Sequence, residues 1–307
     1  MNRVLSLFCM VLTVCSLSAA EAAKLEILPG QSWKSSDDES GGYRIAYPGR
    51  GYDAVTLVAS LRQGKFHRLS FEYRFDNPKQ NLIVMGKILH TSFSQVPEWT
   101  RGMCYFYADE ESGTERIRIY FNPEPGSANA EIRNIRLELL SGEELHSDLI
   151  PGGQFEAGML PQGFWRPGWK QTFSGKLTAG TDFLSGNRSL EMMKPEGDSP
   201  NILITQPLPM FPGGKATLKF WAKASVAQPF VTVLDFSAKG QKKHHYDLKR
   251  HQVTTEWQEY THSASVPSLE QEPALKCRMM HVQLQRFNQP GNVYVDGVSF
   301  QVTTDEK

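Results

Sequence analysis

The sequence predicts an all-β protein that consists of two tandem jelly-roll β-sandwich domains after a signal peptide. Short runs that alternate apolar and polar residues are separated by clusters of Gly, Pro, Asn and Asp, a pattern typical of strands and turns. No stretch keeps the apolar period of a helix over three turns. The same series of segments also occurs twice in the same order, which indicates an internal duplication.

Residues 1–22 have the layout of a secretory signal peptide. Arg3 precedes an apolar run from Val4 to Leu17, and small residues follow around the expected cleavage site. The run is short for a membrane span, and no later stretch reaches the roughly 18 apolar residues that a spanning helix needs. We therefore expect an exported protein without a membrane span, either secreted, periplasmic or held at the cell surface.

The duplication divides the chain into two modules. It predicts a degenerate first module at residues 24–140, a polar linker at 141–148 and a second module at 149–303. Each module has about the right size for two packed antiparallel sheets. The matched segments, first copy before second, are 28–34 with 149–156 (the faintest), 64–74 with 214–223, 97–106 with 255–264, 115–121 with 279–287, and 121–139 with 287–302.

Charge and cysteine content narrow the functional classes. The 307 residues include 33 basic and 33 acidic ones, so no net charge attracts the protein to nucleic acid or to an anionic membrane. Removal of the signal peptide would leave two cysteines, Cys104 and Cys277. They are either two buried free thiols or a disulfide between the copies, because sequence alone does not place their α-carbons.

The second copy carries an ordered series of segments that resembles a known family. The series is LIPGGQFEAG, SGNRSLEM, PGGKATLKFWAKA, TEWQEYT and GNVYVDGVSF, spread over residues 147–302. It is similar to the CenC-type carbohydrate-binding modules, the family 4/9 group, and the first copy resembles them only through the repeat. The resemblance implies a β-jelly roll that binds a polysaccharide or oligosaccharide on a concave face or at edge loops. It also suggests a glycoside hydrolase as a partner.

The same resemblance implies a structural calcium ion in the second module. Its ligands would be Glu156 and Asp296, with oxygens from the loop that holds Ser185 and Ser189. Calcium prefers such oxygen ligands, and an acid within an apolar strand is costly to bury unless it is paired or bound to a metal. The alternative is that Asp296 pairs with a nearby Lys or Arg, or caps a turn.

The first copy has basic residues where these two acids stand. Arg133 aligns with Asp296, and Lys34 aligns with Glu156, although the second alignment is uncertain by one residue. Two cationic side chains would repel a divalent ion. We therefore expect calcium in the second module only.

Aromatic and amide side chains of the second copy are the candidates for sugar binding, because flat rings stack on sugar faces while polar groups bond the hydroxyls. Trp165 and Trp169 lie in a Gly/Pro-rich loop and predict either a stacking platform or a lid over the end of the sandwich. Trp221 and Trp257 follow strand alternation and are predicted to be core residues. Candidates on presumed face strands are Tyr246, Gln283, Gln285 and Arg286.

The basic stretch at residues 239–252 predicts either a site for an acidic or sulfated glycan or a solvated hairpin tip. No catalytic sequence motif stands out. The sequence therefore favours an exported, non-catalytic protein that binds polysaccharide near a cell surface or a partner enzyme. The alternatives are a structural or protein-interaction scaffold without a sugar site and, third, a small glycoside hydrolase or lyase.

Overall fold

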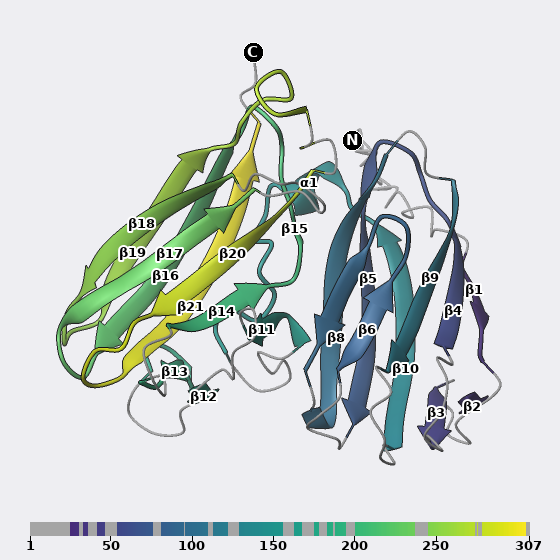
Figure 1. Ribbon diagram of the computed structural model, residues 1–307, viewed down its shortest axis with the longest axis horizontal. Helices are drawn as coiled ribbons and strands as arrows, with labels where there is room; N and C mark the ends of the chain where they lie inside the picture. Colours follow the sequence, from purple (N-terminus) through teal and green to yellow (C-terminus); the bar gives the residue numbers. More distant parts are fainter. Residues whose placement is uncertain are drawn as a thin grey trace, which may run out of the picture.

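The computed structural model shows two β-sandwiches that lie side by side (Figure 1), which confirms the predicted fold class. Alternating burial along the longer strands places one face of each sheet against the opposite sheet. The residues described are 25–30, 33–35, 42–46, 54–75, 81–94, 96–109, 113–121, 129–155, 163–167, 175–177, 183–186, 188–194, 200–236, 245–273, 275 and 278–304.

The first sandwich packs two antiparallel sheets. Sheet A has the strand order β1-β4-β9-β6-β7, and sheet B has the order β2-β3-β10-β5-β8. The strands in chain order are β1 (Leu25–Leu28), β2 (Trp33–Ser35), β3 (Tyr43–Ala46), β4 (Ala54–Ser60), β5 (Lys65–Phe75), β6 (Leu82–Met85), β7 (His90–Phe93), β8 (Val96–Ala108), β9 (Thr114–Phe121) and β10 (Asn129–Leu139).

The second sandwich has the same construction. Sheet C has the order β11-β14-β20-β17-β18, with β15 also paired to β20, and sheet D has the order β12-β13-β21-β16-β19. The strands are β11 (Trp165–Pro167), β12 (Gly175–Leu177), β13 (Leu190–Met192), β14 (Asn201–Thr205), β15 (Leu208–Pro209), β16 (Lys215–Ala224), β17 (Gln228–Asp235), β18 (Tyr246–Val253), β19 (Gln258–Ser265), β20 (Met279–Arg286) and β21 (Val293–Thr303).

The two strand orders confirm the duplication. If β15 is set aside, every strand of the first sandwich has a counterpart at the same place in the second, in the same chain order. The predicted match of 64–74 with 214–223 corresponds to β5 and β16, which occupy equivalent positions in sheets B and D. The faint match of 28–34 with 149–156 does not hold, because residues 28–34 lead from β1 into β2 whereas 149–156 precede β11. Lys34 is therefore not the counterpart of Glu156.

A shared irregularity fixes the alignment of Arg133 with Asp296. Each of these residues is followed by a residue with positive φ, Asn134 at 53° and Gly297 at 56°. Each also lies at a break in the register of its strand pair. Such a bulge reverses the inside–outside alternation of the strand at that point. The two copies therefore share one bulge, and they differ in the charge of the residue that precedes it.

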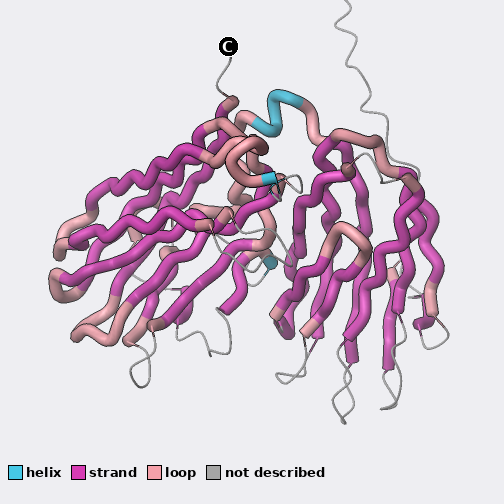
Figure 2. The backbone as a smooth tube through the Cα atoms, turned by 45° about the horizontal axis from the view of Figure 1, so that its top comes forward, coloured by secondary structure: helices cyan, strands magenta, loops and turns pink. Residues whose placement is uncertain are grey.

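The linker predicted at 141–148 contains a turn of helix, α1 (Gly142–Leu145), at the join between the sandwiches (Figure 2). Glu144 N donates to Ser141 Oγ over 3.2 Å, and Ser141 N donates to Glu144 Oε2 over 2.9 Å. This is a capping box, in which a Ser and a Glu three residues later satisfy each other's backbone amides. Polar composition correctly excluded a strand here, but it did not distinguish a capped turn of helix from an irregular linker.

The two sandwiches share apolar packing where they meet. Phe66 of β5 and Tyr105 of β8 belong to the same buried cluster as Phe164 and Trp165. The ring centroids of Tyr105 and Phe164 are 6.4 Å apart, and those of Phe66 and Phe211 are 5.6 Å apart, both in edge-on contact. Such contacts are worth more than their buried area alone. The join is therefore a continuation of the core of the second module.

Polar and backbone contacts complete the join. The Gln206 side chain is fully buried, donates from Nε2 to the carbonyl of Ser92 over 2.8 Å and is in contact with the Thr91 hydroxyl through Oε1. Gly163 lies against the backbone of Arg101 so closely that a β-carbon there would overlap the Arg101 carbonyl. These contacts join β7 and β8 of the first sandwich to residues that flank β11 and β14 in the second. The two modules are therefore held in one arrangement.

The structure shows the state of one of the two cysteines that would remain after removal of the signal peptide. Cys104 is a free thiol that is fully buried in the first core, and burial raises the pKa of that thiol far above its usual value. Cys277 lies outside the described residues. Within the described part of the chain, no helix is long and apolar enough to cross a membrane.

Candidate functional site

Two of the predicted sugar-binding residues are structural. Trp165 is 2% exposed, within the packing that joins the modules, so no sugar can stack on its ring. Arg286 is fully buried, and its guanidinium donates to the carbonyls of Phe287, Gln289 and Gly291. It therefore holds the loop after β20 and does not face solvent. Trp169 lies outside the described residues, so its predicted role stays a prediction.

The other three candidates lie on one surface, the outer face of sheet C. Strand pairing places Tyr246 of β18 opposite Asp235 of β17, and Asp235 opposite His281 of β20. The next row contains Leu248, Val233 and Gln283, and the third contains Arg250, Val231 and Gln285. Residues directly opposite one another in antiparallel strands point to the same side of the sheet. Tyr246, Gln283 and Gln285 therefore share this face.

A chain of hydrogen bonds runs across this face. Gln285 Nε2 donates to Gln283 Oε1 over 2.9 Å, and Gln283 Nε2 donates to Asp235 Oδ2 over 3.2 Å. His281 is anchored separately, since its Nδ1 lies 3.0 Å from the carbonyl of Thr205. These hydrogen bonds hold the two amide groups in fixed orientations.

The β18 edge of the face is open and apolar. Tyr246 is 61% exposed and Leu248 is 53% exposed, whereas Val231 and Val233 in the middle of the same face are buried. Exposed large apolar side chains beside ordered polar groups are the combination that a sugar requires. Sequence reasoning found Tyr246, Gln283 and Gln285 but missed Leu248 and Asp235, because strand register joins them to the site.

A second aromatic surface lies on the outer face of sheet D. Trp221 and Trp257 were predicted to be core residues, but both are only partly buried and lie outside the core cluster. Lys223 Nζ lies 5.6 Å from the centroid of the Trp257 ring and 5.5 Å from that of Tyr294. These distances are in the range of cation–π contacts. Alternation showed that the residues share a face, but it did not show which face of the strand is buried.

Asp296, the predicted calcium ligand, is fully buried on the outer side of β21 opposite Trp221. Its Oδ2 accepts hydrogen bonds from the amides of Leu184 (3.0 Å) and Ser185 (3.2 Å), and its Oδ1 accepts from Gly297 N (2.7 Å). The predicted loop therefore does meet Asp296, but it presents N–H groups, which do not bind a cation. Ser189 is buried nearby in the chain, and Glu156 lies outside the described residues.

This arrangement does not by itself form a calcium site. Asp296 contributes one carboxylate that already accepts amide hydrogen bonds, and the described residues contain no cluster of three His, Cys, Asp or Glu side chains suited to a metal. Calcium normally takes six to eight oxygen ligands. The calcium ion thus stays a prediction from the resemblance.

The first module accommodates the opposite charge at the same bulge. Arg133 Nε donates to Glu72 Oε2 over 2.7 Å, and the Arg133 guanidinium lies 3.9 Å from the centroid of the Trp99 ring. Arg74 approaches the same ring at 4.8 Å. The cation at position 133 is therefore paired with an acid and stacked on an aromatic ring. The carboxylate at this bulge, that of Glu72, is thus already bonded to Arg133.

A polar chain inside the second sandwich has a hydroxyl, an imidazole and a carboxylate in sequence. Thr232 Oγ1 lies 2.8 Å from His262 Nδ1, and His262 Nε2 lies 2.6 Å from Asp247 Oδ1. The Thr232 hydroxyl also lies 2.9 Å from His251 Nε2. Thr232 is fully buried between the sheets, so a substrate cannot reach it. The chain connects β17, β18 and β19, and it is a structural link between sheets C and D.

Comparisons with known proteins give resemblance in fold only. No protein-family model and no curated protein matches the chain. A solved tandem CBM22-1–CBM22-2 domain of Xyn10C from Paenibacillus barcinonensis is 13% identical, with 93% of this chain and 99% of that chain covered and a TM-score of 0.40. TmCBM61 in complex with β-1,4-galactotriose is 12% identical over 52% of this chain and 99% of that chain, with a TM-score of 0.35.

A solved enzyme domain is similar to a comparable degree. The enzymatically active domain of tailspike protein 4 from bacteriophage CBA120 is 16% identical, with 54% of this chain and 23% of that chain covered and a TM-score of 0.39. At these identities and TM-scores the likeness assigns neither a ligand nor an activity to this chain.

Proposed function

We propose that the protein is an exported, non-catalytic glycan-binding protein whose second module holds a polysaccharide on the outer face of sheet C. One observation carries the proposal: Tyr246 and Leu248 are exposed beside the ordered side chains of Gln283, Gln285 and Asp235. A sugar ring would lie against the apolar pair, and its hydroxyls would bond to the amides and the carboxylate. Export follows from the predicted signal peptide at residues 1–22.

The geometry suits an extended chain of sugars more than a single ring. The rows that contain Tyr246, Leu248 and Arg250 follow one another along β18, so successive sugars of one chain would contact successive rows. Residues two apart on a strand are separated by about 6.6 Å, which lets neighbouring rows contact different parts of one chain. Because the contacts are shallow, affinity would come from several of them together.

The test is a glycan array with the full-length protein, followed by titration of the best ligand. Replacing Tyr246 with Ala removes an exposed ring without disturbing the core, and we expect binding to weaken about tenfold. Gln283→Ala is expected to weaken binding less, since a neutral hydrogen bond is worth about 1 kcal/mol. Trp257→Ala, on the opposite sheet, is the matched control and should bind as the unmodified protein does.

The outcomes separate the alternatives. Loss of binding in Trp257→Ala with full binding in Tyr246→Ala would move the site to the outer face of sheet D. Absence of binding to every glycan on the array would contradict the proposal and favour a scaffold that binds another protein. Release of shortened oligosaccharides from a bound polysaccharide would contradict the non-catalytic assignment.

A further inference from the structure

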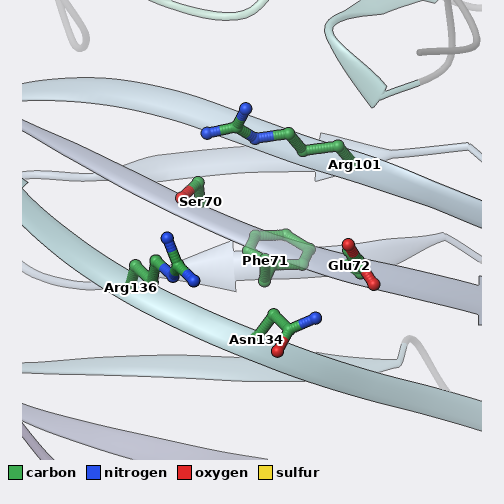
Figure 3. Close-up of a pocket in the computed structure, with 6 residues that line it drawn as sticks. All are labelled: Ser70, Phe71, Glu72, Arg101, Asn134 and Arg136. Carbon is green, nitrogen blue, oxygen red and sulfur yellow. The ribbon is translucent and has the colours of Figure 1, made fainter. Parts of the chain in front are cut away.

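The outer face of sheet B in the first module contains a pocket at the bulge of β10 (Figure 3). Its volume is about 190 Å³, and its lining residues are Ser70, Phe71, Glu72, Arg101, Asn134 and Arg136. A water molecule takes about 30 Å³ in the liquid, so the pocket has room for a small polyatomic group. The bulge produces the hollow because Asn134, at φ 53°, interrupts the pairing of β10 with β5.

The described residues do not neutralise the positive charge in this pocket. Figure 3 shows the side chains of Arg101 and Arg136 on either side of Ser70. Both arginines are exposed, and neither guanidinium group makes an ion pair or a hydrogen bond to another described residue. The one acid that lines the pocket, Glu72, is already bonded to Arg133 over 2.7 Å.

The other acids of the adjacent strands β5 and β10 are paired as well. Glu131 bonds to Arg44 and Arg74, and Glu138 bonds to Arg68. Carboxylates that could approach the pocket from these neighbouring strands are therefore bound elsewhere. The guanidinium groups of Arg101 and Arg136 thus face the pocket without a carboxylate partner among the described residues.

We propose that this pocket binds an oxyanion carried on a sugar, a carboxylate or a sulfate ester, so that the first module recognises acidic polysaccharides. A guanidinium presents a planar set of donors that matches two oxygens of a carboxylate or sulfate, and two guanidinium groups flank the Ser70 end of the pocket. The Asn134 side chain, also at the pocket, offers further donors and acceptors to the sugar hydroxyls.

The second module does not repeat this pocket. At the equivalent bulge Trp221 takes the place of Glu72 in the pairing, and the amides of Leu184 and Ser185 cover Asp296. The acid at position 296 would also repel an anion. The oxyanion site is thus a property of the first module, and it does not depend on the sugar site proposed on sheet C.

The experiment titrates the full-length protein at low ionic strength with two pairs of polymers. Polygalacturonate is compared with its methyl ester, and dextran sulfate is compared with dextran, so that each acidic polymer has an uncharged control; sodium sulfate is the small probe. Arg101→Gln and Arg136→Gln each remove one guanidinium. Arg116→Gln, an exposed arginine on sheet A, is the matched control for loss of one positive charge.

We expect at least one acidic polymer to bind, and we expect each pocket variant to weaken that binding about tenfold or more, since a hydrogen bond to a charged group contributes about 1.5–3 kcal/mol. Arg116→Gln should leave it unchanged, and added salt should weaken it. Which acidic polymer binds identifies the carboxylate or the sulfate source.

Three results would overturn the proposal: no binding of either acidic polymer, an equal loss in Arg116→Gln, or binding of free sulfate without either polymer. Unchanged melting temperatures in the pocket variants would exclude misfolding as the cause of a loss. If Tyr246→Ala reduced binding of acidic and neutral glycans alike, a single site on sheet C would account for both.

Discussion

The α-carbon of Gly163 rests against the backbone carbonyl of Arg101, with no room for a side chain between the two modules. The contact lies beside the shared packing of Tyr105 with Phe164. The backbones of the two modules are therefore in direct contact at this point. Glycine is required here for close approach and not for an unusual backbone angle.

This contact predicts a sharp effect of a single methyl group. Gly163→Ala would push the modules apart and lower the free energy of unfolding by about 1–3 kcal/mol, the usual cost of overpacking. Gly142→Ala is the control, because a β-carbon at that position in α1 would meet open space. Urea denaturation followed by tryptophan fluorescence measures both. A Gly163→Ala protein as stable as the control would show that the modules do not depend on this approach.

The buried amide of Gln206 offers an independent test of the join. Gln206→Ala leaves the Ser92 carbonyl and the Thr91 hydroxyl without their partner, so we expect a loss of about 1–3 kcal/mol in unfolding free energy. Gln301→Ala, at an exposed position of β21, should cost less than about 0.5 kcal/mol. Separate unfolding transitions in Gln206→Ala, followed by calorimetry, would confirm that the amide couples the modules; a loss no larger than that of the control would contradict the prediction.

The histidine pair between sheets C and D predicts how stability depends on pH. Burial, with the charge of Lys249 and neighbouring His262, lowers the pKa of His251 from 6.5 to about 4. Burial also lowers the pKa of His262, although Asp247 acts in the opposite direction. Since the unfolded chain binds more protons between these values, the free energy of unfolding should fall as the pH falls from 6.5 to 4, by up to about 3 kcal/mol for His251.

The variant His251→Gln removes one of the two titrating groups. We expect a shallower decline of the urea midpoint across that pH window, whatever the absolute stability of the variant. Gln301→Ala, at an exposed position of β21 without a titratable side chain, should keep the slope of the unmodified protein. An identical slope in His251→Gln would mean that this imidazole does not lose its proton on folding.

A substitution of Asp296 tests both its amide hydrogen bonds and the predicted calcium ion. Asp296→Asn replaces a charged acceptor of three amide hydrogen bonds by a neutral one, so we expect a loss of about 2 kcal/mol in unfolding free energy. If calcium binds as the resemblance implies, EDTA should lower the melting temperature of the unmodified protein and have no effect on Asp296→Asn. No response to EDTA in either protein would show that the carboxylate acts only as an acceptor for the loop amides.

The fold was predictable because its signals are local. Alternation in segments such as 214–223 predicts a strand. Because the matching segments of the other copy alternate as well, these strands are predicted twice. The site was predictable only in part. Trp165 looked like an open loop residue because the sequence does not show that the first module covers it, and the outward position of Trp221 depends on which face of β16 is buried.

The pocket at Arg101 and Arg136 illustrates the same limit more strongly. These residues are 35 positions apart on strands that are not adjacent, and β5 brings them together. No local pattern records that the acids of β5 and β10 are already paired. The comparison of the two repeats aligned Arg133 with Asp296, but it did not show that each of them precedes a bulge.

The continuous packing across Phe66, Tyr105 and Trp165 has a consequence for how the chain would hold a polymer. If the two modules form one rigid body, the sugar surface proposed on sheet C and the pocket proposed on sheet B are separated by a constant distance. A polymer that reaches both gains a high effective concentration at the second once it is held at the first, whereas a fragment shorter than the span gains nothing. The rigid join would then set a minimum chain length for tight binding. This length would decide which polymers are retained, more than the identity of any one sugar.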